Sequence, residues 1–203
     1  VYVINTCSVT HMGEKKSRQI IRRAKKNNAD GLVIVTGCYA QLSPDALAAI
    51  PDVDAVIGTN ERKNIVPVVN RLLSERTNVA VQAVHDVMGR DAFEEIPLYP
   101  SAVEHTRADL KMQEGCNNFC SYCIIPYTRG SLKSRRPDAV IAEAGRLAEA
   151  GFKEIVLTGI HLGAYGLDLP ERPTLALILK RLIEETDIER IRMGSVESAE
   201  IDD

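Results

Sequence analysis

Three of the five cysteines in this 203-residue chain lie in one stretch, EGCNNFCSYCIIPYTRG, residues 114–130. Cys116, Cys120 and Cys123 have the spacing C-x3-C-x2-C. A structural zinc site uses four protein ligands, often as two C-x2-C pairs, and no histidine near this stretch completes such a set. A thioredoxin-type redox site needs only C-x-x-C and leaves Cys116 unexplained. Three thiolates can instead hold three irons of a 4Fe–4S cluster and leave the fourth iron open to a small molecule.

The other two cysteines, Cys7 and Cys38, each end an apolar, β-branched run, VYVINTC and GLVIVTGC, and are expected to open loops. Adjacent parallel strands end at the same edge of a sheet, so two cysteines that are distant in sequence can meet there. The alternative for either residue alone is a small buried hydrophobe. Five cysteines without a secretory signal fit a disulfide framework poorly and indicate a reducing, cytoplasmic location.

Alternating strands and helices must position these cysteines. Hydrophobic periodicity predicts strands at 1–7, 31–38 and 53–59, and helices at 11–28, 43–50 and 60–75. Ser43 is expected to cap the helix at 43–50. Pro67 is expected either to kink the helix at 60–75 or to mark a later start for it. Apolar strands without polar alternation, separated by helices, indicate a parallel sheet covered on both faces. We therefore expect an N-terminal α/β domain with a parallel sheet over residues 1–76.

A second series of strands and helices is predicted over residues 107–203. It follows a connection at 77–106 that lacks a sustained helical period and contains Pro97 and Pro100. Residues 107–115 are predicted to contain a strand that leads into the cysteine loop. Further strands are predicted at 153–159 and 188–198, helices at 137–151 and 174–186, and a Gly-rich loop at 160–173. Chemistry in parallel βα barrels lies at the carboxyl ends of the strands, which is where the cysteine loop begins. We expect the first three βα steps of a partial barrel.

Composition and charge narrow the class of protein. Hydrophobic residues make up 45% and charged residues 26%, as in ordinary globular proteins, and no apolar run is long enough to cross a bilayer. No membrane partner is therefore expected. The formal net charge of -3 gives no global support for a nucleic-acid partner, so any basic binding surface must be local. Because the chain starts inside a predicted strand without Met, we expect it to be an internal fragment.

The motif CNNFCSYC has the form C-x3-C-x-aromatic-C, with Tyr122 at the aromatic position. Together with INTCSVT, VTGCYAQ, IIPYTRG and LTGIHLGAYG, it resembles the radical S-adenosylmethionine (SAM) tRNA methylthiotransferases from end to end of the chain. The branch that it resembles acts on N6-threonylcarbamoyladenosine in tRNA. The resemblance implies an N-terminal methylthiotransferase domain, a radical SAM domain, and an enzyme that inserts sulfur and a methyl group at C2 of that base, next to the anticodon.

The resemblance also implies two 4Fe–4S clusters and SAM as cofactors. Cys116, Cys120 and Cys123 would hold the cluster that binds SAM, and an electron from a donor such as flavodoxin or ferredoxin would cleave SAM to a radical. Around SAM, the implied roles are Tyr122 near the adenine, Gly159 beside the methionine part, and Ser195 and Glu197 at the ribose or methionine end. For Ser195 and Glu197 the alternative is an exposed strand terminus.

Cys7 and Cys38 would hold the second, auxiliary cluster, with a third cysteine that the family has in a segment before Val1. This cluster is linked in the family to the inserted sulfur. Asn5 and Thr6 support its loop in one interpretation and are simple turn residues in the other. His161 in LTGIHLGAYG would bind the carboxylate of the threonylcarbamoyl group, and its alternative is a polar residue of a Gly-rich turn.

Two basic groups are candidates for contacts with tRNA phosphates. The stretch EKKSRQIIRRAKK, residues 14–26, predicts a basic band on a helix, for which a solvated helix face is the alternative. The stretch RGSLKSRRP adds Arg129, Lys133, Arg135 and Arg136 just after the cysteine loop, where phosphates near an active site would lie. The tRNA anticodon loop is the expected partner, because single-stranded loops expose bases to enzymes.

Three classes of function stay open from the sequence. The first is the tRNA methylthiotransferase acting on threonylcarbamoyladenosine. The second is a related radical SAM methylthiotransferase that acts on isopentenyladenosine in tRNA or on a ribosomal protein, and it would share both sets of cysteines. The third is a zinc-stabilised binding module, which predicts colourless protein with bound zinc and no response to SAM.

Overall fold

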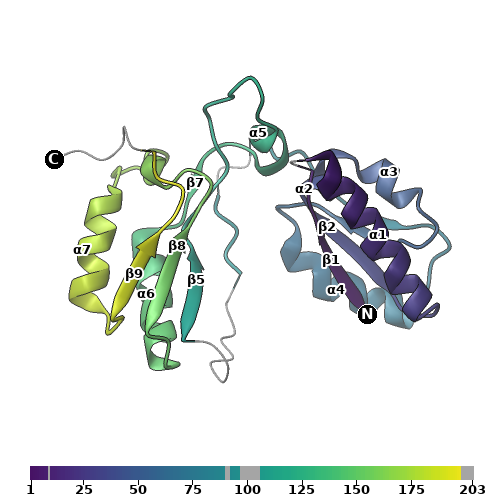
Figure 1. Cartoon of the computed structure of the whole chain (residues 1–203), viewed down its shortest axis with the longest axis horizontal. Coiled ribbons are helices and arrows are strands. Elements are labelled where there is room, and N and C mark those ends of the chain that lie inside the picture. Colours follow the sequence, from purple (N-terminus) through teal and green to yellow (C-terminus); the bar gives the residue numbers. More distant parts are fainter. Residues whose placement is uncertain (9, 90–91, 97–105, 198–203) are drawn as a thin grey trace. The chain divides into compact units, whose positions relative to one another are not determined.

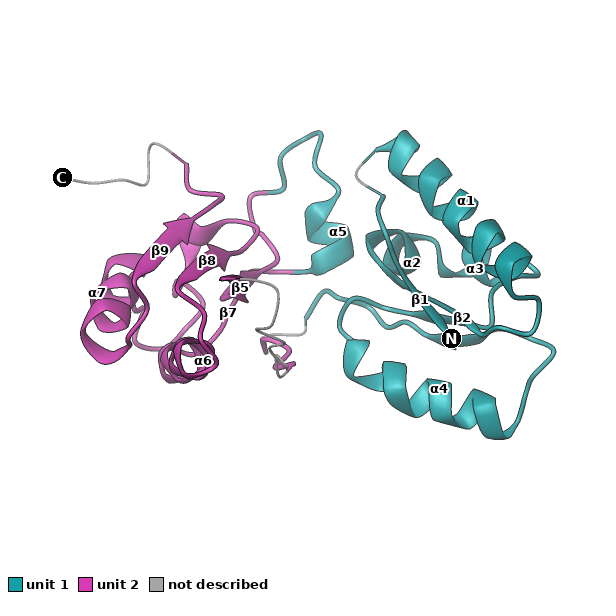
Figure 2. Cartoon of the chain, turned by 60° about the horizontal axis from the view of Figure 1, so that its bottom comes forward, with its two compact units in different colours: residues 1–89, 119–130 teal, residues 90–118, 131–203 magenta. Residues whose placement is uncertain are grey.

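The computed structural model describes residues 1–8, 10–89, 92–96 and 106–197 (Figure 1). The chain forms two compact units, coloured separately in Figure 2: residues 1–89 with 119–130, and residues 90–118 with 131–203. We call them unit 1 and unit 2. Residues 119–130 of the cysteine loop therefore belong to unit 1, although both flanking segments belong to unit 2. Within the described part of the chain, no helix is long and apolar enough to cross a membrane.

Unit 1 is built around one parallel sheet, sheet A, as the sequence predicts. Its strands lie in the order β1 (Tyr2–Thr6), β2 (Val33–Gly37), β3 (Ala55–Ile57) and β4 (Val81–Ala83). The helices are α1 (His11–Asn27), α2 (Cys38–Leu42), α3 (Pro44–Ala48) and α4 (Ile65–Ser74), with a 3-10 turn at Arg62–Asn64 before α4. The side chain of Thr10 caps α1 by accepting a hydrogen bond from the Gly13 N–H, at 3.0 Å.

Both faces of sheet A are buried, which explains why its strands are apolar without alternation. On one face Val33 and Val35 of β2 pack in a cluster with Ile21 of α1. On the other face Ile34 packs in a second cluster with Leu72 of α4. A single strand thus supplies side chains to two hydrophobic cores.

Three expectations for unit 1 need correction or refinement. Cys38 begins helix α2 directly and does not open a loop. The segment expected to be a plain connection contributes β4 to sheet A. Ser43 stands at the N-cap of α3, but its side chain makes no capping hydrogen bond. The three domain ranges expected from the sequence stay a prediction.

Unit 2 contains the predicted three-stranded parallel sheet, sheet B, in the order β5 (Arg107–Lys111), β8 (Glu154–Thr158), β9 (Arg190–Met193). Its helices are α6 (Pro137–Glu149) and α7 (Leu175–Glu185), and a 3-10 turn, η2 (Leu162–Ala164), lies in the Gly-rich loop. A short antiparallel pair, β6 (Gln113–Glu114) and β7 (Lys133–Ser134), flanks the cysteine loop. Helix α5 (Ile125–Arg129) lies between them in sequence and belongs to unit 1.

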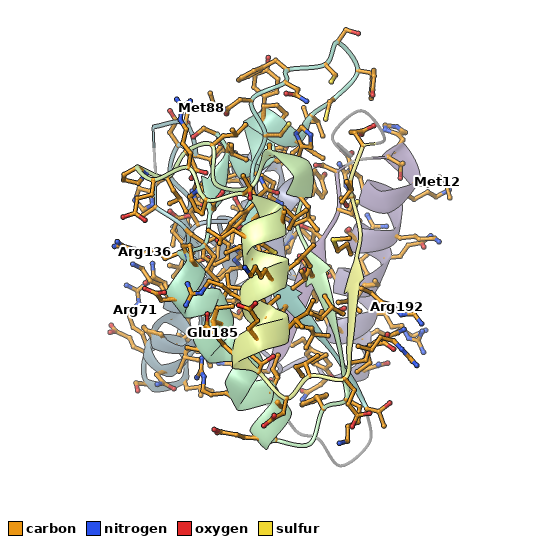
Figure 3. The ribbon with its side chains drawn as sticks, turned by 90° about the vertical axis from the view of Figure 1, so that its left-hand side faces the viewer. Met12, Arg71, Met88, Arg136, Glu185 and Arg192 are labelled. Atoms are coloured by element: carbon orange, nitrogen blue, oxygen red, sulfur yellow. The ribbon has the colours of Figure 1, made fainter. Side chains whose placement is uncertain are left out.

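The two faces of sheet B differ in chemistry. Ile155 and Leu157 of β8 pack with α6 and α7 in one apolar cluster. The alternate residue Glu154 forms ion pairs with two arginines of β9, to Arg190 at 3.1 Å and Arg192 at 2.7 Å. Figure 3 labels Arg192 on β9 and Glu185 near the end of α7. The helices therefore cover one face, and the face that carries Glu154 is polar.

We expect Tyr165 to make the stability of unit 2 sensitive to alkaline pH. Its side chain is 2% exposed, its hydroxyl donates to the Arg135 carbonyl oxygen at 2.6 Å, and burial raises its pKa above the ordinary value. In the unfolded chain the phenol loses its proton near pH 10, while the folded chain keeps it. The stabilisation of the folded chain by the protonated, buried Tyr165 is therefore complete below about pH 10 and is lost as the pH rises further.

We expect Tyr165→Phe to lower the free energy of unfolding by about 1 kcal/mol at neutral pH, because one hydrogen bond is lost. The variant should also lose less stability than the wild type above about pH 10. Urea unfolding across the pH range measures both effects, with Tyr122→Phe as the control because Tyr122 is 91% exposed. Equal alkaline slopes for Tyr165→Phe and the wild type would contradict the assignment to Tyr165.

Candidate active site

The cysteine loop follows β5 and β6, at the carboxyl end of the first strand of sheet B. Its backbone has a positive φ at three residues: Gly115 at 71°, Phe119 at 46° and, after α5, Gly130 at 78°. Cys120 is exposed, Cys116 and Cys123 are partly exposed, and all three are free thiols. The Cys123 N–H donates to the Cys120 carbonyl oxygen at 2.8 Å, which closes a tight turn around C-x2-C. The loop therefore presents its thiols to solvent.

The donor set of the loop fits an iron–sulfur cluster. Residues 115–130 contain three thiols and no Asp, Glu or His, so sulfur is the only side-chain donor that binds soft metals there. Within the described ranges, no three His, Cys, Asp or Glu side chains gather closely enough to hold a metal ion. The structure thus shows the three thiols on one loop but not in a preformed cage, and their role as ligands stays a prediction.

Gln113 links the cysteine loop to the Gly-rich loop after β8. Its side chain is fully buried, and its amide nitrogen donates to the carbonyl oxygens of Glu114 and Gly115, at 2.9 and 2.7 Å. Its amide oxygen accepts the N–H groups of Ile160 and His161, at 2.7 and 2.8 Å. One side chain thus satisfies four backbone groups and fixes the start of the first loop against the second.

Gly159 lies where a side chain has no room. A Cβ built on it would stand 2.8 Å from Oε1 of Gln113 and 2.7 Å from a methyl carbon of Leu162. The resemblance implies a cofactor role for this glycine, and the structure adds a packing reason that needs no cofactor. Its place beside the methionine part of SAM stays a prediction.

We expect Gly159→Ala to lower the free energy of unfolding by about 1–3 kcal/mol, because the methyl group forces Gln113 or Leu162 to move. Gly145→Ala is the matched control. Gly145 lies inside α6 with nothing within 4 Å of its added Cβ, so alanine there should stabilise by about 0.5–1 kcal/mol. Urea unfolding of both variants measures the difference between their free energies of unfolding. An unchanged free energy for Gly159→Ala would show that Gln113 and Leu162 move at little cost.

A hollow of ≈ 160 Å³ in unit 2 brings His161 to the cysteine loop. Asn117 and Asn118, which follow Cys116, line one part of it, and His161 and Asp168 of the Gly-rich loop line another. Two side chains of the lining also fix backbone: Asn117 accepts the Leu132 N–H at 2.9 Å, and Asp168 accepts the Ser134 N–H at 2.8 Å. The hollow therefore combines these polar side chains with an apolar part formed by Leu132, Ala164 and Leu167.

Ser195 and Glu197 follow the end of β9, which is shorter than the strand predicted at 188–198. Ser195 has a positive φ of 58°, and its carbonyl oxygen accepts the Leu162 N–H at 3.0 Å. The loop after β9 is thus tied to the Gly-rich loop. Both side chains are exposed, and their contact with SAM stays a prediction.

Cys7 and Cys38 follow directly on paired residues of adjacent strands. The register of β1 and β2 pairs Thr6 with Gly37, so the next residue of each strand is a cysteine at the same edge of sheet A. Cys38 is buried at the first turn of α2, whereas Cys7 is exposed. The Ser17 hydroxyl accepts the Cys7 N–H at 3.4 Å, which ties the Cys7 loop to α1. Two thiol donors at one edge fit a shared metal centre that takes further ligands from elsewhere.

Thr6 and Asn5 support the neighbouring Cys38. The Thr6 hydroxyl donates to the Thr36 carbonyl oxygen at 2.6 Å and accepts the Ala40 N–H at 3.2 Å. It thereby satisfies an N–H in the first turn of α2, as a capping side chain does. Asn5 approaches Gly37, whose φ of 98° and close contacts exclude a side chain. Asn5 and Thr6 are the last two residues of β1, so the interpretation as simple turn residues is wrong, and Thr6 supports the start of α2.

Two separate parts of the chain match known protein families. Residues 1–58 match the family described as Uncharacterized protein family UPF0004, and residues 110–198 match the Radical SAM superfamily. Residues 110–198 are therefore similar to radical SAM domains. A 4Fe–4S cluster and SAM are the cofactors that such a domain implies, and the three-thiol loop lies inside the matched residues.

Curated relatives match the chain outside the radical SAM domain as well. A threonylcarbamoyladenosine tRNA methylthiotransferase, MtaB, from Bacillus subtilis (strain 168) is 48% identical over 100% of this chain and 44% of the relative. A tRNA-2-methylthio-N(6)-dimethylallyladenosine synthase from Pelotomaculum thermopropionicum is 34% identical over 95% of the chain and 43% of that relative. The resemblance to methylthiotransferases is confirmed, and the chain spans less than half the length of these relatives.

A solved structure supports the fold of the chain. The radical S-adenosylmethionine methyltransferase TsrM from Kitasatospora setae aligns with a TM-score of 0.57 and 16% identity, over 90% of this chain and 39% of that one. At this identity the likeness concerns the fold alone. It agrees with the predicted α/β architecture.

Two of the four basic residues proposed to contact phosphates after the cysteine loop are buried, and the prediction is wrong for these two. Lys133 and Arg135 are buried, and Arg135 pairs with Glu95 at 2.7 Å and with Glu143 at 3.4 Å. Arg129 donates to the sulfur of Cys38, and of the four basic residues Arg136 alone is exposed. Arg135 is therefore held by carboxylates within unit 2, and Arg129 contacts Cys38 within unit 1.

The basic band on α1 is mostly exposed, as expected for either of its two interpretations. Arg18 donates to the Tyr39 hydroxyl at 2.9 Å and Lys25 pairs with Asp54 at 3.1 Å. The other basic side chains of the band are exposed: Lys15, Lys16, Arg22, Arg23 and Lys26. The structure therefore leaves a solvated basic surface on this helix.

Proposed function

We propose that this chain is part of a radical SAM methylthiotransferase that inserts sulfur and a methyl group at C2 of N6-threonylcarbamoyladenosine, next to the anticodon of tRNA. The observation that carries the proposal is the three-thiol loop at the carboxyl end of the first parallel strand of a radical SAM domain. The substrate is supported by the 48% identity to a relative that is named for it, against 34% to one named for dimethylallyladenosine.

In this proposal Cys116, Cys120 and Cys123 would hold the cluster that binds SAM. The cluster and SAM, when bound, supply radical chemistry, and the chain supplies orientation and shielding from water. Tyr122 is exposed on the same loop and would lie near the adenine, and Gly159 would lie beside the methionine part. Ser195 and Glu197 would contact the ribose or the methionine end from the loop after β9.

Cys7 and Cys38 would contribute to a second cluster, whose remaining ligand would be a third cysteine. Such a cluster would place sulfur for insertion at the substrate carbon. His161, in the hollow beside the cysteine loop, is a candidate for binding the carboxylate of the threonylcarbamoyl group. The exposed basic side chains of α1 are candidates for contacts with tRNA phosphates. The electron donor, flavodoxin or ferredoxin, and the cytoplasmic location stay predictions.

Electron paramagnetic resonance on the reconstituted, reduced full-length protein tests the chemistry. The signal of a reduced cluster should change when SAM is added, because SAM would occupy the open iron. A cluster signal indifferent to SAM would overturn the radical SAM assignment. Bound zinc without iron would instead support the zinc-stabilised binding module.

Mass spectrometry of the product tests the substrate. The full-length enzyme is incubated with tRNA that carries threonylcarbamoyladenosine and, separately, with tRNA that carries dimethylallyladenosine. The first nucleoside should gain one methylthio group in place of hydrogen. Modification of the second nucleoside, or of a ribosomal protein, with the first left unchanged would favour the related enzymes.

A further inference from the structure

Helix α5 connects the SAM-binding loop to the N-terminal cysteines within unit 1. It begins two residues after Cys123 and packs against α2, which begins at Cys38 (Figure 2). Its anchor is a buried hydrogen bond, in which the Thr59 hydroxyl donates to the Thr128 carbonyl oxygen at 2.8 Å. Thr128 is fully buried, so the last turn of α5 is anchored to the segment that follows β3.

This anchoring brings one side chain to the sulfur of Cys38. Arg129, the last residue of α5, donates from Nε to Cys38 Sγ at 3.1 Å across 91 positions of sequence. Cys38 is only 7% exposed, so the contact is largely shielded from water and is weakly screened. Two features fix the backbone around Cys38: the Ala40 N–H donates to the Thr6 hydroxyl, and Gly37 makes a tight turn. Donor and acceptor are therefore both held on rigid elements.

We propose that Arg129 is a positioning residue for the second cluster, orienting Cys38 as a ligand and raising the reduction potential of the cluster that Cys38 holds. The inference rests on the proposed function, because it requires a cluster at Cys7 and Cys38. Hydrogen bonds to ligand sulfurs set cluster potentials. A reduced cluster carries one more negative charge than an oxidised one, and a nearby guanidinium stabilises that extra charge.

The variants Arg129→Gln and Arg129→Lys separate charge from shape. Glutamine removes the charge and keeps a shorter hydrogen-bonding side chain, whereas lysine keeps the charge without the planar fork. Arg136→Gln is the matched control, since Arg136 is an exposed arginine seven residues later (Figure 3). All are made in the full-length protein with Cys116, Cys120 and Cys123 replaced by alanine, so that only the second cluster is observed.

The readout is a redox titration followed by electron paramagnetic resonance, together with the iron content. At a fixed potential near the wild-type midpoint, Arg129→Gln should lower the ratio of reduced to oxidised cluster about tenfold, which equals about 59 mV for a one-electron couple. Arg129→Lys should restore part of this loss, and Arg136→Gln should titrate like the wild type. Lower iron occupancy in Arg129→Gln, with an unchanged circular dichroism spectrum, would support the orienting role.

The failures are distinguishable. A second cluster that forms in every variant with the wild-type midpoint and iron content overturns the role of Arg129 and leaves the proposed function intact. A protein with intact Arg129 that assembles no iron at Cys7 and Cys38 overturns both this inference and the two-cluster enzyme. An Arg136→Gln shift as large as that of Arg129→Gln would also contradict the proposal, because it would show a general effect of charge.

Discussion

Replacing Cys120 with alanine should abolish SAM cleavage by the full-length protein. The three thiols of the cysteine loop are the only side-chain donors for soft metals in residues 115–130, so no neighbouring group can take the place of Cys120. Loss of a group that merely supports a metal ligand costs 10–100-fold, so loss of the ligand itself should cost roughly 100-fold or more. Formation of 5′-deoxyadenosine from SAM, followed by chromatography, measures the effect.

Ser121→Ala is the matched control for this experiment. Ser121 is the neighbouring exposed residue of the same loop and carries no thiol. It should cleave SAM like the wild type, while Cys120→Ala should also lose about half of the iron of a protein with two clusters. Undiminished cleavage by Cys120→Ala would contradict the assignment of the loop as the cluster site.

Replacing Gln113 with leucine should strongly destabilise unit 2. The change leaves two backbone N–H groups and two backbone carbonyl groups near a fully buried position without their partner. Each unsatisfied buried group costs about 1–3 kcal/mol, and water reaching some of them reduces the sum, so we expect a loss of about 3–5 kcal/mol. Urea unfolding followed by circular dichroism measures the free energy of unfolding.

Gln113→Glu and Gln82→Leu complete the test of this side chain. Glutamate keeps the oxygen that accepts from Ile160 and His161 but places a second oxygen against two carbonyl groups, so it should still destabilise. Gln82 is an exposed glutamine of β4, and its change to leucine should stay within about 0.5 kcal/mol. Wild-type stability in Gln113→Leu would show that the loops hold together without this clamp.

The sequence predicts the elements of this fold well, because their signals are local. The apolar run around Val33–Val35 has no polar alternation, and both faces of β2 are indeed buried. The spacing of the three thiols likewise needs no tertiary information. Both features lie within a few residues of one another, which is why a single sequence suffices to find them.

Other features depend on partners that are far away in sequence. In the sequence RGSLKSRRP, Arg135 looks like a free cation, yet it forms ion pairs with Glu95 and Glu143. The neighbouring sequence gives no sign of these pairs. The start of α2 at Cys38 depends on the hydroxyl of Thr6, on another strand. Gln113 falls on the polar side of the alternation in RADLKMQ, so the sequence predicts an exposed side chain, whereas the folded chain buries it. These side chains become meaningful once the topology is known.

The assignment of residues 119–130 to unit 1 has a consequence for dissecting the protein. The chain passes between the two units three times, after residues 89, 118 and 130, so no single cut separates them. A fragment that starts at residue 107 would carry all three thiols of the loop but would leave α5 without the Thr59 hydroxyl that anchors it. Gene fusions, truncations and exchanges between homologues should therefore keep the N-terminal sheet and the cysteine loop from the same parent.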